Sequence, residues 1–197
     1  MTLANVSRET TLRLEQYEAL VTKASEAQNL VSRATIAEFR TRHIADAVQL
    51  VSLAPPGRNW CDVGSGAGLP GLVVAIVSGD PVTLIEPRRL RADFLRHAVR
   101  GLKLYRVEVI EAKAERVQRQ FDVITARAVA ELGKLFAMTE HLAHPASLWI
   151  LPKGRSAKKE LEAARQSWQG EFRLVPSRTR DDAMIVVAER VTRRGKA

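Results

Sequence analysis

The stretch Asp62-Val63-Gly64-Ser65-Gly66-Ala67-Gly68-Leu69-Pro70-Gly71 decides the fold of this chain. It follows a short apolar run over residues 59–63 and precedes another over residues 72–77. Glycines between a strand and a helix let the backbone approach a ligand and leave free N–H groups at the helix start. Proline is well accommodated in the first turn of a helix, so Pro70 favours a helix beginning here. The stretch therefore predicts a strand, a ligand-binding turn over residues 65–69 and a helix that packs on a sheet.

Two classes of cofactor fit such a turn. Gly66-x-Gly68-x-x-Gly71 matches the dinucleotide fingerprint, and Glu86 follows at about the spacing of twenty residues that this fingerprint requires. Asp62 and Gly64 extend the motif to Asp-x-Gly-x-Gly-x-Gly, which resembles the form found in S-adenosylmethionine-dependent methyltransferases. The upstream residues favour the second class, while a dinucleotide-dependent enzyme and a purely structural turn stay open as alternatives.

Length and composition indicate one compact catalytic domain. The chain has 197 residues, enough for a single α/β core, and 46% of them are hydrophobic. The apolar run at residues 72–77 is too short to cross a bilayer, and the residues after Met1 lack the layout of a secretory signal. The single cysteine, Cys61, excludes an internal disulfide and is expected to be buried in the first strand. We expect a cytoplasmic protein that has no contact with a membrane.

The charge of the chain indicates a polyanionic partner. The 31 lysines and arginines exceed the 22 acidic residues, for a net charge of +9 and a pI near 10.3. One arginine cluster lies within residues 88–100, and a basic tail is expected to track phosphates; the tail comprises Arg190, Arg193, Arg194 and Lys196. Each cluster alone is equally typical of a solvated surface, but the excess over the whole chain favours binding to nucleic acid.

The apolar spacing predicts a short N-terminal helical extension, and the glycine motif favours a methyltransferase domain after it. Residues 7–27 and 35–53 have helical periodicity, and Pro55-Pro56-Gly57 ends that pattern. We therefore divide the chain into an extension over residues 1–54, packed on the core, and a domain over residues 55–197.

Within the domain, strand-like and helix-like segments alternate, which is typical of a mostly parallel sheet. The expected strands cover residues 59–63, 82–86, 107–110, 121–125, 148–151, 172–175 and 184–191, with helices beginning at residues 70, 87 and 156. The loop at residues 177–182 is too short for a parallel crossover, so the last two strands form an antiparallel hairpin. The predicted fold is a Rossmann-like α/β fold with a seven-stranded sheet.

Ligands bind outside the carboxyl ends of parallel strands, which directs attention to the residues that follow each strand. Glu86 ends the second strand, where a carboxylate can accept hydrogen bonds from both ribose hydroxyls. Ala114 and Glu115 follow the third strand and are expected to flank the adenine. Asp122 is a weaker candidate because it begins its strand. The alternative for Glu86 is a surface acid at a strand end, and the alternative for Ala114 and Glu115 is that they have no part in the site.

Several further segments together resemble the RsmG (GidB) family of guanine-N7 methyltransferases of small-subunit ribosomal RNA. The resemblance covers most of the chain. The segments are Gln28-Asn29-Leu30-Val31-Ser32, Arg42-His43-Ile44-Ala45-Asp46, Gly64 to Gly71, Phe94-Leu95, Arg127-Ala128 and Leu151-Pro152-Lys153-Gly154. The Arg-His-Ile-x-Asp segment combined with a proline-containing glycine loop is the most specific part. Leu69 stands where family members often have Phe, which keeps the position apolar.

The resemblance implies S-adenosyl-L-methionine as the cofactor and 16S ribosomal RNA of the small subunit as the partner. With the strand-end residues above, the expected cofactor-binding set is Gly64, Ser65, Gly66, Gly68, Leu69, Glu86, Ala114, Glu115 and Arg127. The expected RNA-binding residues are Arg42, His43 and Lys153. We expect a monomer. His97, His141 and His144 lack the companions that a metal site needs, so no metal is expected.

The implied chemistry requires alignment more than acid–base catalysis. Guanine N7 has an in-plane lone pair in the neutral base, so no general base is expected. An arginine can orient the base through O6 and leave N7 free, and Arg127 is the expected catalytic residue. Its alternative role is a structural ion pair. For Arg42, His43 and Asp46 the alternative is to dock the N-terminal extension on the sheet, and for Lys153 it is an exposed loop position.

Three other functions stay open on the sequence alone. The same fold serves methyltransferases of small molecules or proteins, since fold does not fix function. The dinucleotide reading corresponds to an oxidoreductase, for which no catalytic acid or base tied to hydride transfer is evident. A non-catalytic RNA-binding module is the third alternative, and failure to bind S-adenosylmethionine would support it.

Overall fold

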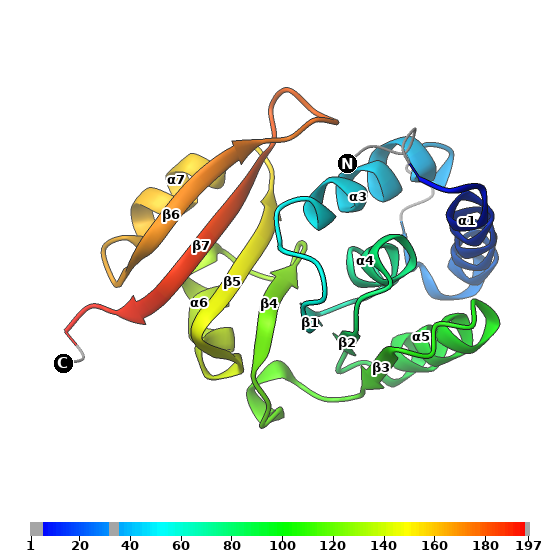
Figure 1. Ribbon diagram of the computed structural model, residues 1–197, viewed down its shortest axis with the longest axis horizontal. Coiled ribbons are helices and arrows are strands. Elements are labelled where there is room, and N and C mark those ends of the chain that lie inside the picture. Colours follow the sequence, from blue (N-terminus) through cyan, green and yellow to red (C-terminus); the bar gives the residue numbers. More distant parts are fainter. Residues whose placement is uncertain (1–5, 32–35, 196–197) are drawn as a thin grey trace.

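The computed structural model describes residues 6–31 and 36–195, and it has the predicted Rossmann-like α/β fold (Figure 1). Seven strands form one sheet in the order β3-β2-β1-β4-β5-β7-β6. The strands are β1 (Trp60–Val63), β2 (Val82–Ile85), β3 (Val107–Ile110), β4 (Phe121–Ala126), β5 (Ala143–Lys153), β6 (Trp168–Pro176) and β7 (Met184–Arg193). Strands β1 to β5 are parallel, and β7 runs antiparallel to both β5 and β6. The predicted seven-stranded sheet and its antiparallel C-terminal hairpin are therefore confirmed.

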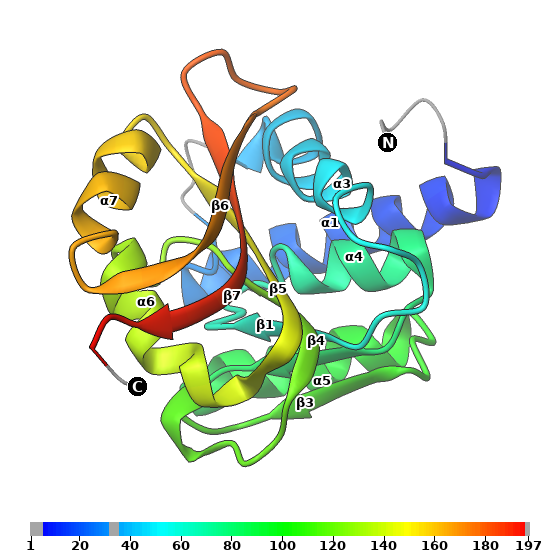
Figure 2. The ribbon, with the colours of Figure 1, turned by 60° about the vertical axis from the view of Figure 1, so that its left-hand side comes forward.

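Helices cover both faces of the sheet (Figure 2). They are α1 (Arg8–Gln28), the π-helix η2 (Phe39–Ile44), α3 (Ala45–Val51), α4 (Gly71–Ser78), α5 (Arg89–Gly101), the 3-10 turns η3 (Ala114–Arg116) and η4 (Glu140–Leu142), α6 (Leu132–Thr139) and α7 (Ala157–Ala164). Alternate residues of β1 face opposite sides, so Trp60 joins one hydrophobic core and Cys61 the other. The core on the side of Trp60 contains α1, α3, α4 and α5, and the other contains α6 and α7.

The N-terminal segment shares its core with the rest of the chain. Leu14, Tyr17 and Val21 lie on one face of α1, are fully buried, and join a cluster that includes Leu72 of α4 and Leu95 of α5. Helix α1 is held at its start by Ser7, whose hydroxyl accepts a hydrogen bond from the Thr10 amide at 3.1 Å. The segment thus packs against the helices that flank the glycine loop. The boundary at residue 54 remains a prediction.

Four expectations about the elements were wrong. The helix expected over residues 35–53 is split into η2 and α3, and its first residue lies outside the described chain. Helix α6 was not predicted. Strand β5 begins five residues before the predicted start at residue 148, and β6 begins at Trp168, four residues before the predicted start at residue 172. The extra residues of β5 and β6 gain backbone partners on β4 and β7, and such pairing is invisible in a local pattern.

The expected basic tail is largely part of the sheet. Arg190 and Arg193 belong to β7, where they form ion pairs with Glu171 at 2.9 Å and Glu140 at 3.1 Å. Lys196 lies outside the described residues. Cys61, by contrast, is fully buried as expected.

Candidate functional site

The glycine loop joins β1 to α4 in a conformation that requires glycine. Gly64 has φ +67°, in the left-handed region that residues with a side chain rarely adopt. A Cβ at this position would also lie 2.8 Å from Cγ2 of Val129, so the side chain of Val129 fills the space that glycine leaves. Position 64 is therefore fixed by both backbone conformation and packing.

Neighbouring elements hold the loop in place. The amides of Gly64 and Ser65 donate to the Ile85 carbonyl at 2.8 and 3.1 Å, at the end of β2. The amide of Gly66 donates to Glu86 Oε2 at 2.8 Å. From the other side, the buried hydroxyl of Tyr17 in α1 donates to the Ala67 carbonyl at 3.0 Å. Helix α1 is thus a direct support of the loop, a role that the sequence did not reveal.

Asp62 lies beneath the loop with an unpaired oxygen. The residue is fully buried, and its Oδ2 accepts a hydrogen bond from the Gly71 amide at 3.1 Å. Its Oδ1 is buried and has no partner within the described part of the chain. Burial raises the pKa of Asp62 to about 7, against the opposing effect of the hydrogen bond from the Gly71 amide. The carboxyl group therefore titrates near neutral pH.

A cavity of about 350 Å³ lies beside the loop, and we call it the cofactor cavity. Its walls are Leu30, Val31, His43, Gly64, Ser65, Gly66, Ala67, Leu69, Arg91, Arg127 and Ala128. Five residues of the predicted cofactor set line it: Gly64, Ser65, Gly66, Leu69 and Arg127. S-adenosylmethionine fits this lining, because a loop of small residues, an apolar wall and two guanidinium groups suit its adenosine and its carboxylate.

The other four residues of the predicted cofactor set lie outside this lining. Both carboxylate oxygens of Glu86 accept backbone hydrogen bonds, from Gly66 at 2.8 Å and from Arg88 at 3.0 Å. Ala114 is buried in η3 and Glu115 beside it is exposed. Gly68 lies within the loop, where its amide donates to the Ser65 carbonyl at 2.7 Å. Cofactor binding by these four residues remains a prediction.

A second cavity of about 600 Å³, which we call the chamber, shares His43, Arg127 and Ala128 with the cofactor cavity. It lies at the carboxyl ends of β4 and β5 and is bounded by η2 and by the loop between β6 and β7. Its walls are Arg42, His43, Asp46, Arg127 to Glu131, Pro152, Lys153, Gly154, Glu160, Arg180 and Ala183. The three residues predicted to bind RNA, Arg42, His43 and Lys153, therefore all line one cavity.

Arg127 and His43 contact each other where the two cavities meet. Nη1 of Arg127 lies 3.0 Å from Nδ1 of His43. A guanidinium can only donate, so Nδ1 accepts and the proton of the neutral ring is on Nε2. Burial and the charges of Arg127 and Arg42 lower the pKa of His43 to about 4, so the ring is neutral at pH 7.

Arg127 has no ion-pair partner among residues 6–31 and 36–195, where every carboxylate lies beyond 4 Å from its guanidinium. Burial lowers the pKa of Arg127, and the more distant Asp46 and Asp62 act in the opposite direction. Within the described residues, Arg127 therefore does not form the structural ion pair that was its alternative role. Its remaining N–H donors suit an acceptor supplied by a ligand.

Asp46 and Gln49 dock the N-terminal segment on the C-terminal hairpin. Oδ1 of Asp46 accepts a hydrogen bond from Thr179 Oγ1. Gln49 donates to Ser177 Oγ at 3.2 Å and accepts from the Arg178 amide at 2.9 Å. These contacts join α3 to the loop between β6 and β7. The docking interpretation therefore applies to Asp46, whereas His43 contacts Arg127 instead.

Lys153 is not an exposed loop lysine. Its side chain is 11% exposed, and Nζ donates to the Ala130 carbonyl at 2.7 Å and pairs with Glu160 at 2.8 Å. Arg42 is more open and lies 3.6 Å from Glu38. Tyr17, Glu160 and Arg91 belong to the site region and were not predicted as site residues. The sequence signal for Tyr17 was the apolar face of α1, and that for Arg91 was the arginine cluster.

Residues 6–31 and 36–195 contain neither a metal-binding cluster nor a membrane-spanning helix. No group of three or more His, Cys, Asp or Glu side chains there is placed to hold a metal ion. No helix of that part is long and apolar enough to span a membrane.

Solved structures with the same fold include methyltransferases. A methyltransferase from Aquifex aeolicus, described as S-adenosylmethionine-dependent, aligns with a TM-score of 0.63 and 16% identity over 84% of this chain and 97% of that one. The ribosomal protein L11 methylase of Lactobacillus delbrueckii subsp. bulgaricus aligns with a TM-score of 0.61 and 17% identity over 76% and 78%. These similarities confirm the predicted fold.

Sequence relatives are more specific. The family model GidB, described as rRNA small subunit methyltransferase G, matches residues 10–179. A protein of Rhizorhabdus wittichii named ribosomal RNA small subunit methyltransferase G is 45% identical over 97% of this chain and 90% of its own length. A Zymomonas mobilis protein of the same name is 39% identical over 94% and 88%. The chain therefore belongs to the GidB family of small-subunit ribosomal RNA methyltransferases.

Proposed function

We propose that this chain transfers the methyl group of S-adenosyl-L-methionine to N7 of one guanine in 16S ribosomal RNA. One observation carries the proposal: the cofactor cavity and the chamber share His43, Arg127 and Ala128, so a methyl donor in one can face a base in the other. Membership of the family makes the chain a methyltransferase of ribosomal RNA that uses S-adenosylmethionine. It also removes the dinucleotide-dependent oxidoreductase as an alternative.

The cofactor supplies an electrophilic methyl group on its sulfonium sulfur. Gly64, Ser65 and Gly66 provide the backbone cradle for it, and Leu69 provides an apolar wall. Arg91 and Arg127 line the same cavity and provide donors for its carboxylate. Tyr17 and Glu86 keep the cradle in shape through their bonds to Ala67 and Gly66.

The chamber orients the base. Guanine N7 attacks with a lone pair that the neutral base already has, so the task of the protein is to align N7 with the methyl group. Alignment of this kind is worth roughly 7–11 kcal/mol in favourable cases. Arg127, held by Nδ1 of His43, donates to O6 of the guanine and leaves N7 free. Arg127 is thus the catalytic residue of this proposal.

The surroundings of the chamber suit a polyanion. The chain carries a net charge of +9, and Arg42 and Arg180 line the chamber beside Arg127. RNA of the small subunit is accordingly the substrate, and the enzyme acts on it as a monomer in the cytoplasm, where the ribosomes are.

Arg127→Ala tests the proposal most simply. With labelled S-adenosylmethionine and small ribosomal subunits from cells that lack this gene, Arg127→Ala should reduce kcat by at least a hundredfold while far-UV circular dichroism stays unchanged. Arg40→Ala is the matched control, because Arg40 also belongs to η2 but pairs with Glu15 at the surface, 2.9 Å away. Full turnover by Arg127→Ala would remove Arg127 from the site.

A further inference from the structure

The loop over residues 127–131 connects the two cavities, and its conformation needs support. It joins β4 to α6 and carries Arg127, which contacts His43, and Val129, which packs against Gly64. Ala128 between them has φ +57°, a left-handed conformation that is unfavourable for a residue with a side chain. Such a loop keeps its shape only if the surrounding structure holds it.

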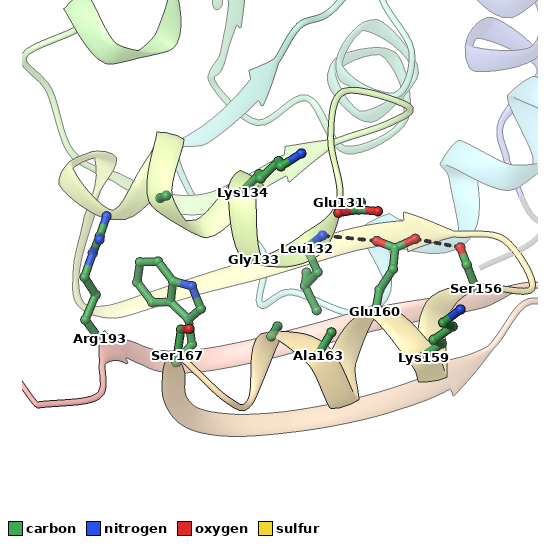
Figure 3. A pocket seen from close by; sticks show the side chains of 13 residues that line it. Glu131, Leu132, Gly133, Lys134, Ser156, Lys159, Glu160, Ala163, Ser167 and Arg193 are labelled. Carbon is green, nitrogen blue, oxygen red and sulfur yellow. Dashed lines mark hydrogen bonds between the residues drawn. The ribbon is translucent and has the colours of Figure 1, made fainter.

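Lys153 and Glu160 provide that support from β5 and α7. Nζ of Lys153 donates to the carbonyl of Ala130 at 2.7 Å. Oε2 of Glu160 accepts from the amide of Leu132 at 3.1 Å, and its Oε1 accepts from Ser156 Oγ at 2.6 Å, as the dashed lines in Figure 3 show. The ion pair between Lys153 and Glu160 therefore holds the chain on both sides of Glu131.

The pair is mostly withdrawn from solvent. The side chains of Lys153 and Glu160 are 11% and 17% exposed, and the charged atoms are 2.8 Å apart. Burial alone would raise the pKa of Glu160, but hydrogen bonds from Lys153 and Ser156 outweigh it and hold this pKa below its usual range. The carboxylate thus stays charged, and the ammonium of Lys153 is already engaged by two protein acceptors.

Glu160 also stands between two cavities. Glu131 and Glu160 line the chamber on one side and, on the other, a cavity of about 680 Å³ between α6 and α7 (Figure 3). Removing either charged partner would leave the other buried without compensation, and the loop would lose its anchor next to the chamber. The effect would reach Arg127 from the Ala130 carbonyl through the two intervening residues Ala128 and Val129.

We propose that Lys153 and Glu160 form a positioning pair for methyl transfer, which fixes the loop that carries Arg127, and that Lys153 does not bind RNA phosphate. This inference rests on the proposed function and replaces the expectation that Lys153 is an RNA ligand. Glu160 acquires a role in the reaction that neither the sequence pattern nor the family comparison assigns to it.

Lys153→Met and Glu160→Gln test the proposal together, with kcat, KM and the salt dependence of 16S RNA binding as readouts. Both variants should reduce kcat at least tenfold, while the slope of log K against log salt stays that of the wild type. The control Lys158→Met removes a charge from an exposed position of α7 and should leave kcat unchanged. If Lys153 instead bound an RNA phosphate, its loss would reduce the magnitude of this slope by about one.

The proposal is overturned if Lys153→Met lowers the slope by about one and Glu160→Gln strengthens RNA binding at normal kcat. Should a single variant fail to fold, Lys153→Met combined with Glu160→Leu replaces the pair by apolar groups, which buried ion pairs commonly tolerate. That variant should fold and still show the reduced kcat. Wild-type kcat in this double variant would contradict a positioning role.

Amide hydrogen exchange separates this inference from the proposed function. In Lys153→Met the amides of residues 127–132 should exchange at least tenfold faster than in the wild type, whatever substrate the enzyme uses. If the wild type transfers no methyl group to RNA, the proposed function fails while this measurement still decides the positioning role. Unchanged exchange in this segment would overturn the positioning role even in an active enzyme.

Discussion

Asp62→Asn should change how the stability of the protein depends on pH. The carboxyl group is fully buried, one of its oxygens has no partner in the described residues, and burial raises its pKa from 3.8 to about 7. Between these two values the unfolded chain has released the proton and the folded chain retains it. Raising the pH through this range therefore favours the unfolded state.

The size of the effect follows from the two pKa values. One pKa unit corresponds to 1.36 kcal/mol, so ionising Asp62 in the folded protein costs on the order of 4 kcal/mol in total. Between pH 5 and pH 8 the wild type should lose about 2.5 kcal/mol of unfolding free energy through this group. Asparagine does not titrate, and its side-chain oxygen can still accept from the Gly71 amide.

Urea unfolding of both proteins at pH 5 and pH 8 measures this difference. The unfolding free energy of Asp62→Asn minus that of the wild type should be about 2.5 kcal/mol larger at pH 8 than at pH 5. His43 acts in the opposite direction, because its lowered pKa makes the folded state lose stability as the pH falls below about 6.5. It is present in both proteins and cancels in the comparison. An equal difference at the two pH values would refute the reasoning.

Three further substitutions probe the loop and its supports. Tyr17→Phe removes the donor to the buried Ala67 carbonyl, so it should lower the unfolding free energy by about 1–3 kcal/mol in urea unfolding and weaken S-adenosylmethionine binding several-fold in calorimetry. Unchanged affinity would mean that α1 does not support the cofactor cavity. Gly64→Ala should weaken cofactor binding at least tenfold, because the new Cβ would collide with Val129. Gly57 also has a positive φ, +77°, but lies in open space, so Gly57→Ala should show only the backbone penalty of about 1–2 kcal/mol in unfolding free energy. Equal effects of the two substitutions would contradict the packing argument. Thr179→Val removes the donor to Asp46 and should lower the unfolding free energy by about 1 kcal/mol and raise KM for RNA; a KM equal to that of the wild type would mean that this docking does not shape the chamber.

The sheet was predictable because its strands carry a strong local signal. The runs at residues 82–85, 107–110 and 121–126 are short, apolar and bounded by turns, and the short loop before Met184 allows only a hairpin. The ends of β5 and β6 depend on partners across the sheet, which a local pattern does not contain. Helix α6 has apolar residues at helical spacing, Leu132, Leu135 and Phe136, but covers only eight residues between two loops.

The π-helix η2 depends on packing that only the folded chain provides. The ring of Phe39 packs between Tyr17 and His43, with centroids 5.7 and 5.6 Å away, and Ile44 is fully buried. The five-residue spacing of Phe39 and Ile44 brings both side chains into the core. A helical pattern over this segment was evident, but its widened turn was not.

Part of the site could be predicted from the sequence. The glycine loop and Arg127 were predicted because they follow strands at the carboxyl edge of the sheet, and the structure gathers five predicted cofactor residues around one cavity. The supports could not be predicted, because Tyr17 is fifty residues from its partner Ala67, and Lys153 at the end of β5 is 23 residues from Ala130, which follows the neighbouring strand β4. The sequence around a lysine that follows a strand does not distinguish a lysine that binds a phosphate from one that binds a backbone carbonyl.

Methyl transfer to small ribosomal subunits from cells that lack this gene tests the central claim most directly. The subunits are incubated with the enzyme and labelled S-adenosylmethionine, and their RNA is then treated with borohydride and aniline, which cut at N7-methylguanine. The account predicts incorporation of label and one strong cleavage site in 16S RNA, both absent with Arg127→Ala. Incorporation without cleavage would contradict N7 as the target, and no incorporation into subunits or stripped RNA would contradict the assignment of ribosomal RNA as substrate.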